Sequence, residues 1–283
     1  MKKIFTILFA LLSGVVFAQI NPTEDAQPIV EEGKLLYKAE MASWYGTDLF
    51  LEKYTQKDNI GGYFSYTDNG IAKCVFFSKG SNAKVIGTIS FDSTYNSETA
   101  RTDLVERSFS KTENELYVIR RLALQEIEND TMFRSYQNTS LNLIPLVNGD
   151  EKKVYVLTGP QETGVVIFGN DYLLTFDKDN KLLVKKQLHR NIIPVYYGKD
   201  EDKNAIGAMH MHLPETGHFI TATDICTLLL YAKFAKWKQH TVVSEKYLNM
   251  WNCESEQLTV IPRDVIEKIN KDQEKRNKKK KSE

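Results

Sequence analysis

The feature that most constrains the fold is a series of short apolar runs, each followed by residues typical of turns. The runs cover residues 153–158, 164–168, 172–176 and 181–188. Gly159-Pro160, Gly169-Asn170 and the segment 177–180 separate them. Runs of this length between glycine, proline, asparagine and aspartate residues are typical of antiparallel strands. The sequence therefore predicts an antiparallel meander at the start of the C-terminal half.

Helical periodicity dominates three other parts of the chain. Apolar residues recur at the spacing of one helix face over 29–51, 112–133 and 221–236. Asn69-Gly70 between two apolar runs indicates a hairpin, and further strands are expected at 85–91, 192–197, 205–213, 240–244 and 247–251. The predicted fold class is α+β, an antiparallel sheet with flanking helices.

This pattern also suggests how the chain is divided. Residues 19–140 form an N-terminal α+β region that begins with a loose leader, 19–28, and ends near a polar connector, 135–142. Residues 141–262 form a domain of sheet plus helix. The segment 263–283 is a charged tail that we expect to be a frayed helix end running into disorder.

The first eighteen residues have the layout of a secretory signal peptide. Lys2 and Lys3 precede an apolar run, and Ala18 precedes the expected cut. The apolar run is about 14 residues long, shorter than the roughly 20 that a membrane-spanning helix needs. Gln19, not cysteine, follows the cut, so no thiol is available there for a lipid anchor. We expect an exported protein, periplasmic or extracellular, without a stable membrane anchor after cleavage.

Charge and cysteine content narrow the class of partner. The chain has 37 basic and 37 acidic residues, and loss of the two leader lysines leaves the mature chain with a net charge of −2. This balance does not favour a nucleic-acid partner. Three cysteines are a poor disulfide framework; Cys226 and Cys253 are the expected pair if one forms.

The segment 210–224, HMHLPETGHFITATD, is the best candidate for a site with chemistry. In a strand, His210 and His212 lie on the same face, where two imidazoles can share a metal ion. Asp224, at the start of the next predicted helix, is a reasonable third ligand, and a fourth position would stay open to water. His189 and His240 are expected at the edge of the core, and His218 in a loop.

His210-Met211-His212 followed by Thr221-x-x-Asp224, a helix and a strand resembles the JAMM (JAB1/MPN/Mov34) metalloprotease motif. The resemblance covers about residues 155–252 and implies an MPN-like C-terminal half that binds Zn²⁺ through His210, His212 and Asp224. It also implies that Thr221, at the position of the family's serine, assists the oxyanion. Glu162 would be the general base that activates the attacking water. The implied activity is hydrolysis of a peptide or isopeptide bond.

The same segment has a purely architectural explanation. Thr221 and Asp224 form a capping box, and residues 214–217 are an ordinary turn. Histidines at a strand end need not bind any ligand. Two functions thus remain open: an exported zinc hydrolase, or a non-catalytic exported protein that binds a peptide or protein partner and has a degenerate or absent metal site.

Overall fold

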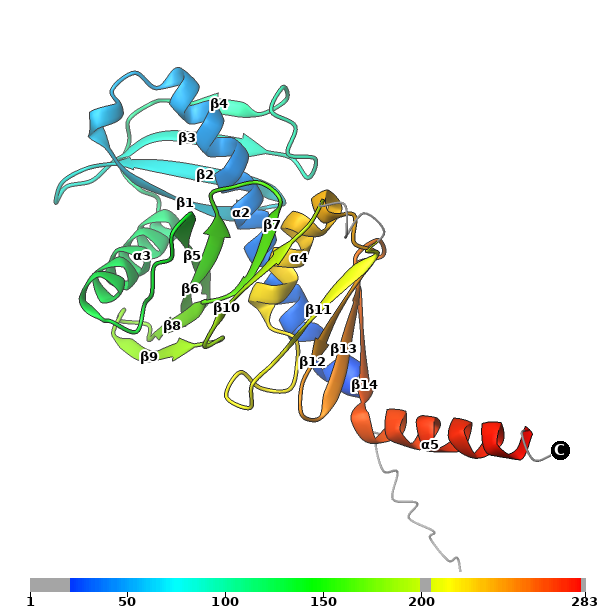
Figure 1. Cartoon of the computed structure of the whole chain (residues 1–283). Helices are drawn as coiled ribbons and strands as arrows, with labels where there is room; N and C mark the ends of the chain where they lie inside the picture. The colour runs from blue at the N-terminus through cyan, green and yellow to red at the C-terminus, as the bar shows by residue number, and fades with distance from the viewer. Residues whose placement is uncertain (1–20, 199–204, 281–283) are drawn as a thin grey trace, which may run out of the picture.

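The computed structural model describes residues 21–198 and 205–280, and the predicted signal peptide lies outside these residues. The α+β class is confirmed: helices flank several sheets whose strands pair almost entirely antiparallel (Figure 1). Helices α1 (Pro22–Asp25) and α2 (Gln27–Lys53) begin the described chain. The loose leader was therefore a wrong prediction, because Asn21 caps α1 and the chain is helical from Pro22.

The N-terminal sheet packs against α2. It has the order β1-β2-β3-β4, with strands β1 (Ile60–Asp68), β2 (Ile71–Ser78), β3 (Val85–Phe91) and β4 (Arg101–Asp103). A short 3-10 helix, η1 (Lys57–Asn59), leads into β1. Asn69 and Gly70 both have positive φ, as the predicted β1–β2 hairpin turn requires.

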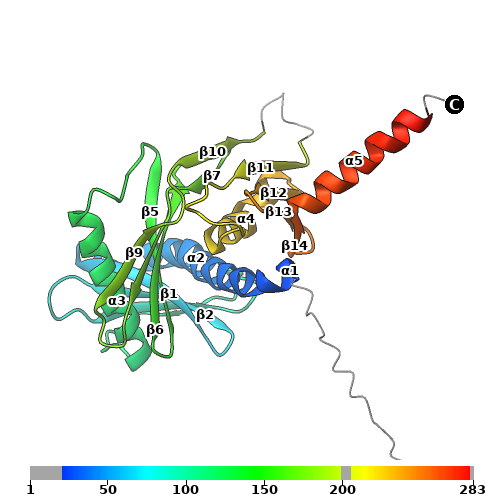
Figure 2. The same ribbon diagram turned by 90° about the horizontal axis from the view of Figure 1, so that it is seen from below.

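A second sheet has the order β5-β6-β8-β9 and lies against α3 (Lys111–Asn129) (Figure 2). Its strands are β5 (Thr139–Asn148), β6 (Glu151–Pro160), β8 (Tyr172–Phe176) and β9 (Leu182–Gln187). Strand β5 occupies part of the expected polar connector. Its alternate side chains Leu141 and Leu143 pack on a buried cluster. This apolar contact stabilises the strand although most of the segment is polar.

The predicted meander is wrong at one strand. Strand β6 pairs with β8, whereas β7 (Val165–Gly169) leaves this sheet and pairs antiparallel with β10 (Ile192–Tyr196). All five residues of β7 are buried. Gly169 has a φ of 75°, and a Cβ there would lie 2.1 Å from the carbonyl oxygen of Asn191. Only glycine allows the chain to pass so close to the residue that precedes β10, the partner of β7.

The C-terminal sheet has the order β11-β12-β13-β14 and contains the one parallel pair of the described chain, β11 with β12. The strands are β11 (Gly207–Met211), β12 (Gln239–Val243), β13 (Tyr247–Asn252) and β14 (Gln257–Pro262). Helix α4 (Ala222–Ala235) is the crossover between β11 and β12. The tail is helical as α5 (Arg263–Lys280), which projects from the body, instead of frayed and disordered over this range (Figures 1 and 2).

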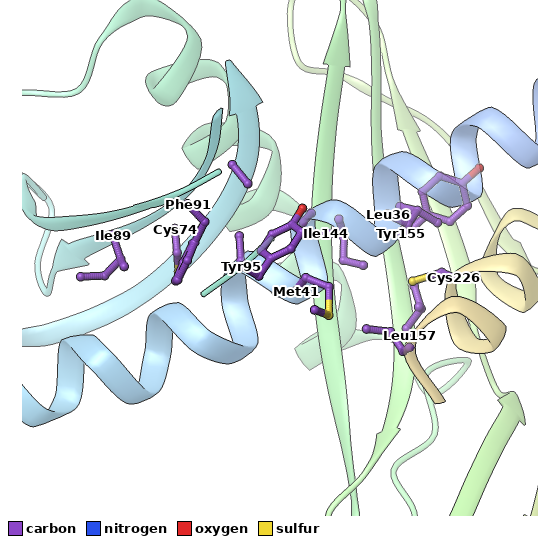
Figure 3. Packing of buried hydrophobic residues seen from close by; sticks show 14 of the residues in the cluster. Leu36, Met41, Cys74, Ile89, Phe91, Tyr95, Ile144, Tyr155, Leu157 and Cys226 are labelled. Atoms are coloured by element: carbon purple, nitrogen blue, oxygen red, sulfur yellow. The ribbon is translucent and has the colours of Figure 1, made fainter. Parts of the chain in front are cut away.

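Helix α2 joins the parts of the fold. Gly33 approaches Ile225 of α4, and Gly46 approaches Cys74 of β2, so closely that a Cβ at either position would clash. The largest buried cluster follows α2 from the N-terminal sheet to Cys226 (Figure 3). Cys226 and Cys253, the pair expected if a disulfide formed, are not bridged: all three cysteines are free, and these two belong to different clusters. No described helix is both long and apolar enough to cross a membrane.

Candidate metal centre

Strand β11 presents its histidines to the interior, as its alternation predicts. His210 and His212 are 5% and 6% exposed, whereas Met209 and Met211 between and beside them are 68% and 69% exposed. The backbone N–H of His212 donates to the carbonyl of Val243, which extends the pairing with β12 beyond Met211. Register with β12 thus fixes both imidazoles on one buried face.

Asp224 reaches the same point from the first turn of α4. Thr221 is the N-cap of this helix, and the predicted capping box is present. The Thr221 hydroxyl donates to Asp224 Oδ2 at 2.8 Å, and the Thr221 backbone N–H donates to the same oxygen at 3.0 Å. The cap therefore holds the carboxylate in one orientation, with the rest of its lone pairs turned toward the histidines.

A third histidine completes the group. His189, which follows β9, brings its Nε2 within 3.0 Å of His212 Nε2 and 3.6 Å of Asp224 Oδ2. His212 Nε2 lies 3.1 Å from Asp224 Oδ2, and His210 Nε2 lies 3.5 Å from Asp224 Oδ1. Ligands about 2.0–2.1 Å from a tetrahedral ion are separated by roughly 3.3 Å. These four distances are close to that value, and the ligand atoms of all four side chains lie within 4.8 Å of one another, so the group could hold a shared metal ion.

The sequence placed His189 at the core edge and did not indicate it as a candidate ligand. Its position depends on the β8–β9 hairpin, which pairs Tyr172 with Gln187 and so puts Asp171 beside His189. Asp171 Oδ1 accepts from His189 Nδ1 at 2.8 Å, and Asp171 Oδ2 accepts from the Thr223 hydroxyl. A carboxylate bound to the far nitrogen of a histidine is the usual second contact of a metal-ligating imidazole, because it fixes the ring and its tautomer.

The two carboxylates of the group attract positive charge, which either a proton on His189 or a metal ion can supply. Burial opposes protonation of His189, but the carboxylates of Asp171 and Asp224 outweigh it and raise the pKa of His189 to about 9. Burial lowers the pKa of His210 to about 4, so this ring is neutral and has a free lone pair at neutral pH. Burial opposes the charge of Asp224 too, yet the surrounding imidazoles hold its pKa well below its ordinary value.

The hydrogen bonds of His210 indicate whether these residues fit a metal ion. His210 Nε2 is buried and has no hydrogen-bond partner among the described residues, while the Nδ1 of the same ring lies 2.9 Å from His240 Nε2. A buried polar atom without a partner is unfavourable, and coordination would satisfy it. The Nδ1 of His212 is also without a hydrogen-bond partner in the described chain.

Phe168 of β7 covers the His210 and His240 rings at centroid distances of 4.9 and 4.7 Å.

The structure brings together the three predicted ligands and, of the two predicted catalytic residues, Thr221 but not Glu162. Thr221 contacts Asp224 and caps α4. Glu162 precedes β7 and accepts a hydrogen bond from Asn138, whereas His189 lies beside Gly169 at the other end of this strand. A strand rises about 3.3 Å per residue, so the two ends of β7 are roughly 13 Å apart. Glu162 is thus separated from the histidines by the length of β7.

Comparison of the chain with protein-family models, with curated proteins and with solved structures found no match.

Proposed function

We propose that this is an exported zinc protein in which His189, His210, His212 and Asp224 bind one Zn²⁺. The single observation that supports it best is the convergence of these four side chains, whose ligand atoms all lie within 4.8 Å of one another although they come from three separate parts of the chain. Three imidazoles and one carboxylate are a ligand set that Zn²⁺ accepts readily. The Asp171–His189 and Thr221–Asp224 contacts supply the outer support that metal ligands normally have.

The geometry favours a stabilising zinc ion over a catalytic one. Structural zinc sites use four protein ligands, whereas catalytic sites leave one position to water or substrate. Here His189 occupies the fourth position, and the side chains of the four ligands are at most 4% exposed. The ion would connect the β9–β10 segment, the end of β11 and the start of α4. This corresponds to a non-catalytic exported protein with an intact metal centre.

The metal content of the purified protein tests this proposal. The mature chain, with any histidine tag removed, is expected to contain about one zinc per molecule by mass spectrometry of the metal. His212→Ala should abolish binding, whereas His218→Ala should not, because His218 lies in the same segment but outside the group. Zinc absent from the wild type, or equally retained by His212→Ala, would exclude the proposal.

A JAMM-like zinc hydrolase is the second candidate. The order β11, α4, β12 favours it, because this order places His210 and His212 at the end of β11 next to Asp224 at the start of α4. In this case His189 would not ligate the metal. Its ring, held by Asp171, would act as a general acid, because the two carboxylates keep it protonated at neutral pH. The zinc ion, when bound, would act as a Lewis acid on the scissile carbonyl.

His189→Ala distinguishes the two candidates. In the four-ligand centre the variant loses zinc affinity by a large factor, because one of four ligands is removed. In the hydrolase it retains zinc but loses cleavage of a peptide or isopeptide test substrate. Wild-type protein that binds zinc and cleaves neither kind of bond would leave the stabilising role and eliminate the hydrolase.

A further inference from the structure

A cleft of about 830 Å³ lies at the other end of β7 from the histidine group. Its walls come from α2, β5, the β6–β7 turn and α4. This volume is in the range of sites that hold a small organic molecule. None of the metal-centre residues lines it. The cleft is therefore a separate place at which a ligand can bind.

The charge of the cleft has one sign. Glu40, Asp48 and Glu162 line it, and no lysine, arginine or histidine does so among the residues that the structure describes. The whole chain has equal numbers of basic and acidic residues, so this asymmetry is a property of the cleft and not of the composition. The described charges of the lining itself are therefore all negative and attract a positively charged ligand, while two cations, Lys233 and Arg120, contact the rings of the lining residues Phe234 and Tyr63.

Glu40 is a lining carboxylate whose charge is only partly compensated. Its Oε2 accepts one hydrogen bond, from Asn142 Nδ2 at 2.9 Å. Burial raises the pKa of Glu40 to about 7, and the Asn142 hydrogen bond offsets only part of this effect. Burial and then the Glu40 charge raise the pKa of Tyr63, another lining residue, to about 12. A cation next to Glu40 would neutralise this field.

Aromatic rings form the wall nearest to solvent. Trp44 of α2 and Phe234 of α4 are 44% and 48% exposed, and their ring centroids are 6.4 Å apart. Tyr231 continues the wall inward, 6.0 Å from Trp44. Lys233 Nζ lies 5.0 Å above the Phe234 ring, so this wall already accepts an ammonium group on one face. Aromatic faces attract cations through their quadrupole, and tryptophan does so most strongly.

We propose that this cleft binds an organic ammonium ion, whose charged nitrogen lies at Glu40 and whose hydrocarbon part packs on Trp44, Tyr231 and Phe234. The ammonium ion favours the ionised form of Glu40, which then supplies charge and a hydrogen-bond acceptor. The rings supply apolar contact and cation–π attraction. A neutral molecule of the same shape gains only the apolar contact. Charge is therefore the property by which the cleft selects its ligand.

The test uses n-butylammonium as probe and 1-butanol as its neutral counterpart, each titrated into the mature full-length chain. Binding is followed by the indole N–H signal of Trp44 in NMR, assigned through its loss in Trp44→Phe. We expect n-butylammonium to bind at least about tenfold more tightly than 1-butanol, since a paired buried charge is worth more than a factor of ten. Equal affinities would overturn the proposal. A response to cellobiose but not to n-butylammonium would identify a carbohydrate cleft instead and would also overturn it.

Two pairs of variants locate the ligand. Glu40→Gln keeps an oxygen for the Asn142 hydrogen bond and should weaken the binding of n-butylammonium at least about tenfold. Glu162→Gln, at the exposed rim, should change this affinity less than about threefold. Trp44→Leu should weaken binding more than Trp44→Phe, which retains a ring. If Glu40→Gln binds n-butylammonium as tightly as the wild type, the ammonium nitrogen does not lie at Glu40. If Glu40→Gln does not fold, the butanol comparison and the Trp44 pair decide the proposal alone.

Discussion

Removal of the metal should lower the stability of the protein by a large and measurable amount. A ligand that binds only the folded state stabilises it by about 4.1 kcal/mol when its free concentration is a thousand times the dissociation constant. For a chain of this size each kcal/mol changes the melting temperature by about 2–4 °C, so loss of zinc should lower it by roughly 8–16 °C. All four ligands are buried, and the group forms only in the folded chain, so binding to the unfolded state subtracts little.

The assay compares zinc-loaded protein with protein treated with a strong chelator, by calorimetry and with metal content measured on the same samples. His218→Ala should show the full shift, and His212→Ala should melt at one temperature with or without chelator. The reasoning fails if the chelator removes the zinc and the melting temperature changes by less than about 2 °C. In that case the four side chains form a histidine–carboxylate network whose stability does not depend on an ion.

Three further predictions concern residues outside the ligand set. Asp171→Asn should weaken zinc binding by about 10–100-fold in a competition titration, because the His189 ring loses its charged acceptor; unchanged affinity would mean that Asp171 has no part in orienting His189. Thr221→Val should lower the free energy of unfolding by about 1 kcal/mol through loss of the α4 cap, as measured by urea denaturation, and no loss would contradict the capping role. Burial raises the folded-state pKa of Glu40 to about 7 from an ordinary value near 4.5, so the carboxylate destabilises the fold progressively as pH rises through this interval. Glu40→Gln should therefore raise the free energy of unfolding by about 1–3 kcal/mol at pH 8 and have little effect at pH 4; an equal gain at both values would contradict this explanation.

The sequence predicted the elements whose periodicity is strong and failed where tertiary contacts decide. The three long helical patterns correspond to α2, α3 and α4, and the Asn69-Gly70 hairpin is present. Strand β5 was missed because its polar residues mask an alternating pattern whose apolar face needs α3 to cover it. The predicted pairing of β7 was wrong because pairing depends on which strand lies alongside in the fold. The local sequence shows only that β7 is buried.

The candidate site was predictable where its residues are close in sequence. His210, His212 and Asp224 could be found because strand alternation and a capping box each fix a direction over a few residues. His189 could not be found in this way, since it lies 21 residues before His210 and carries no spacing signal of its own. Only the β8–β9 register, which sets Asp171 beside it, would have indicated its role.

The metal centre and the cleft share two elements, and this favours a division of roles between them. Helix α4 carries Asp224 in its first turn and Tyr231 seven residues later, roughly 10 Å along the axis. Strand β7, which packs on α4, runs from Val165 at the cleft to Gly169 at the histidines. In a hydrolase the substrate must reach the metal, but here the open cleft and the buried centre lie at opposite ends of both elements. A bound ion would instead fix one end of α4 and β7, and so hold the cleft walls at their other end in position.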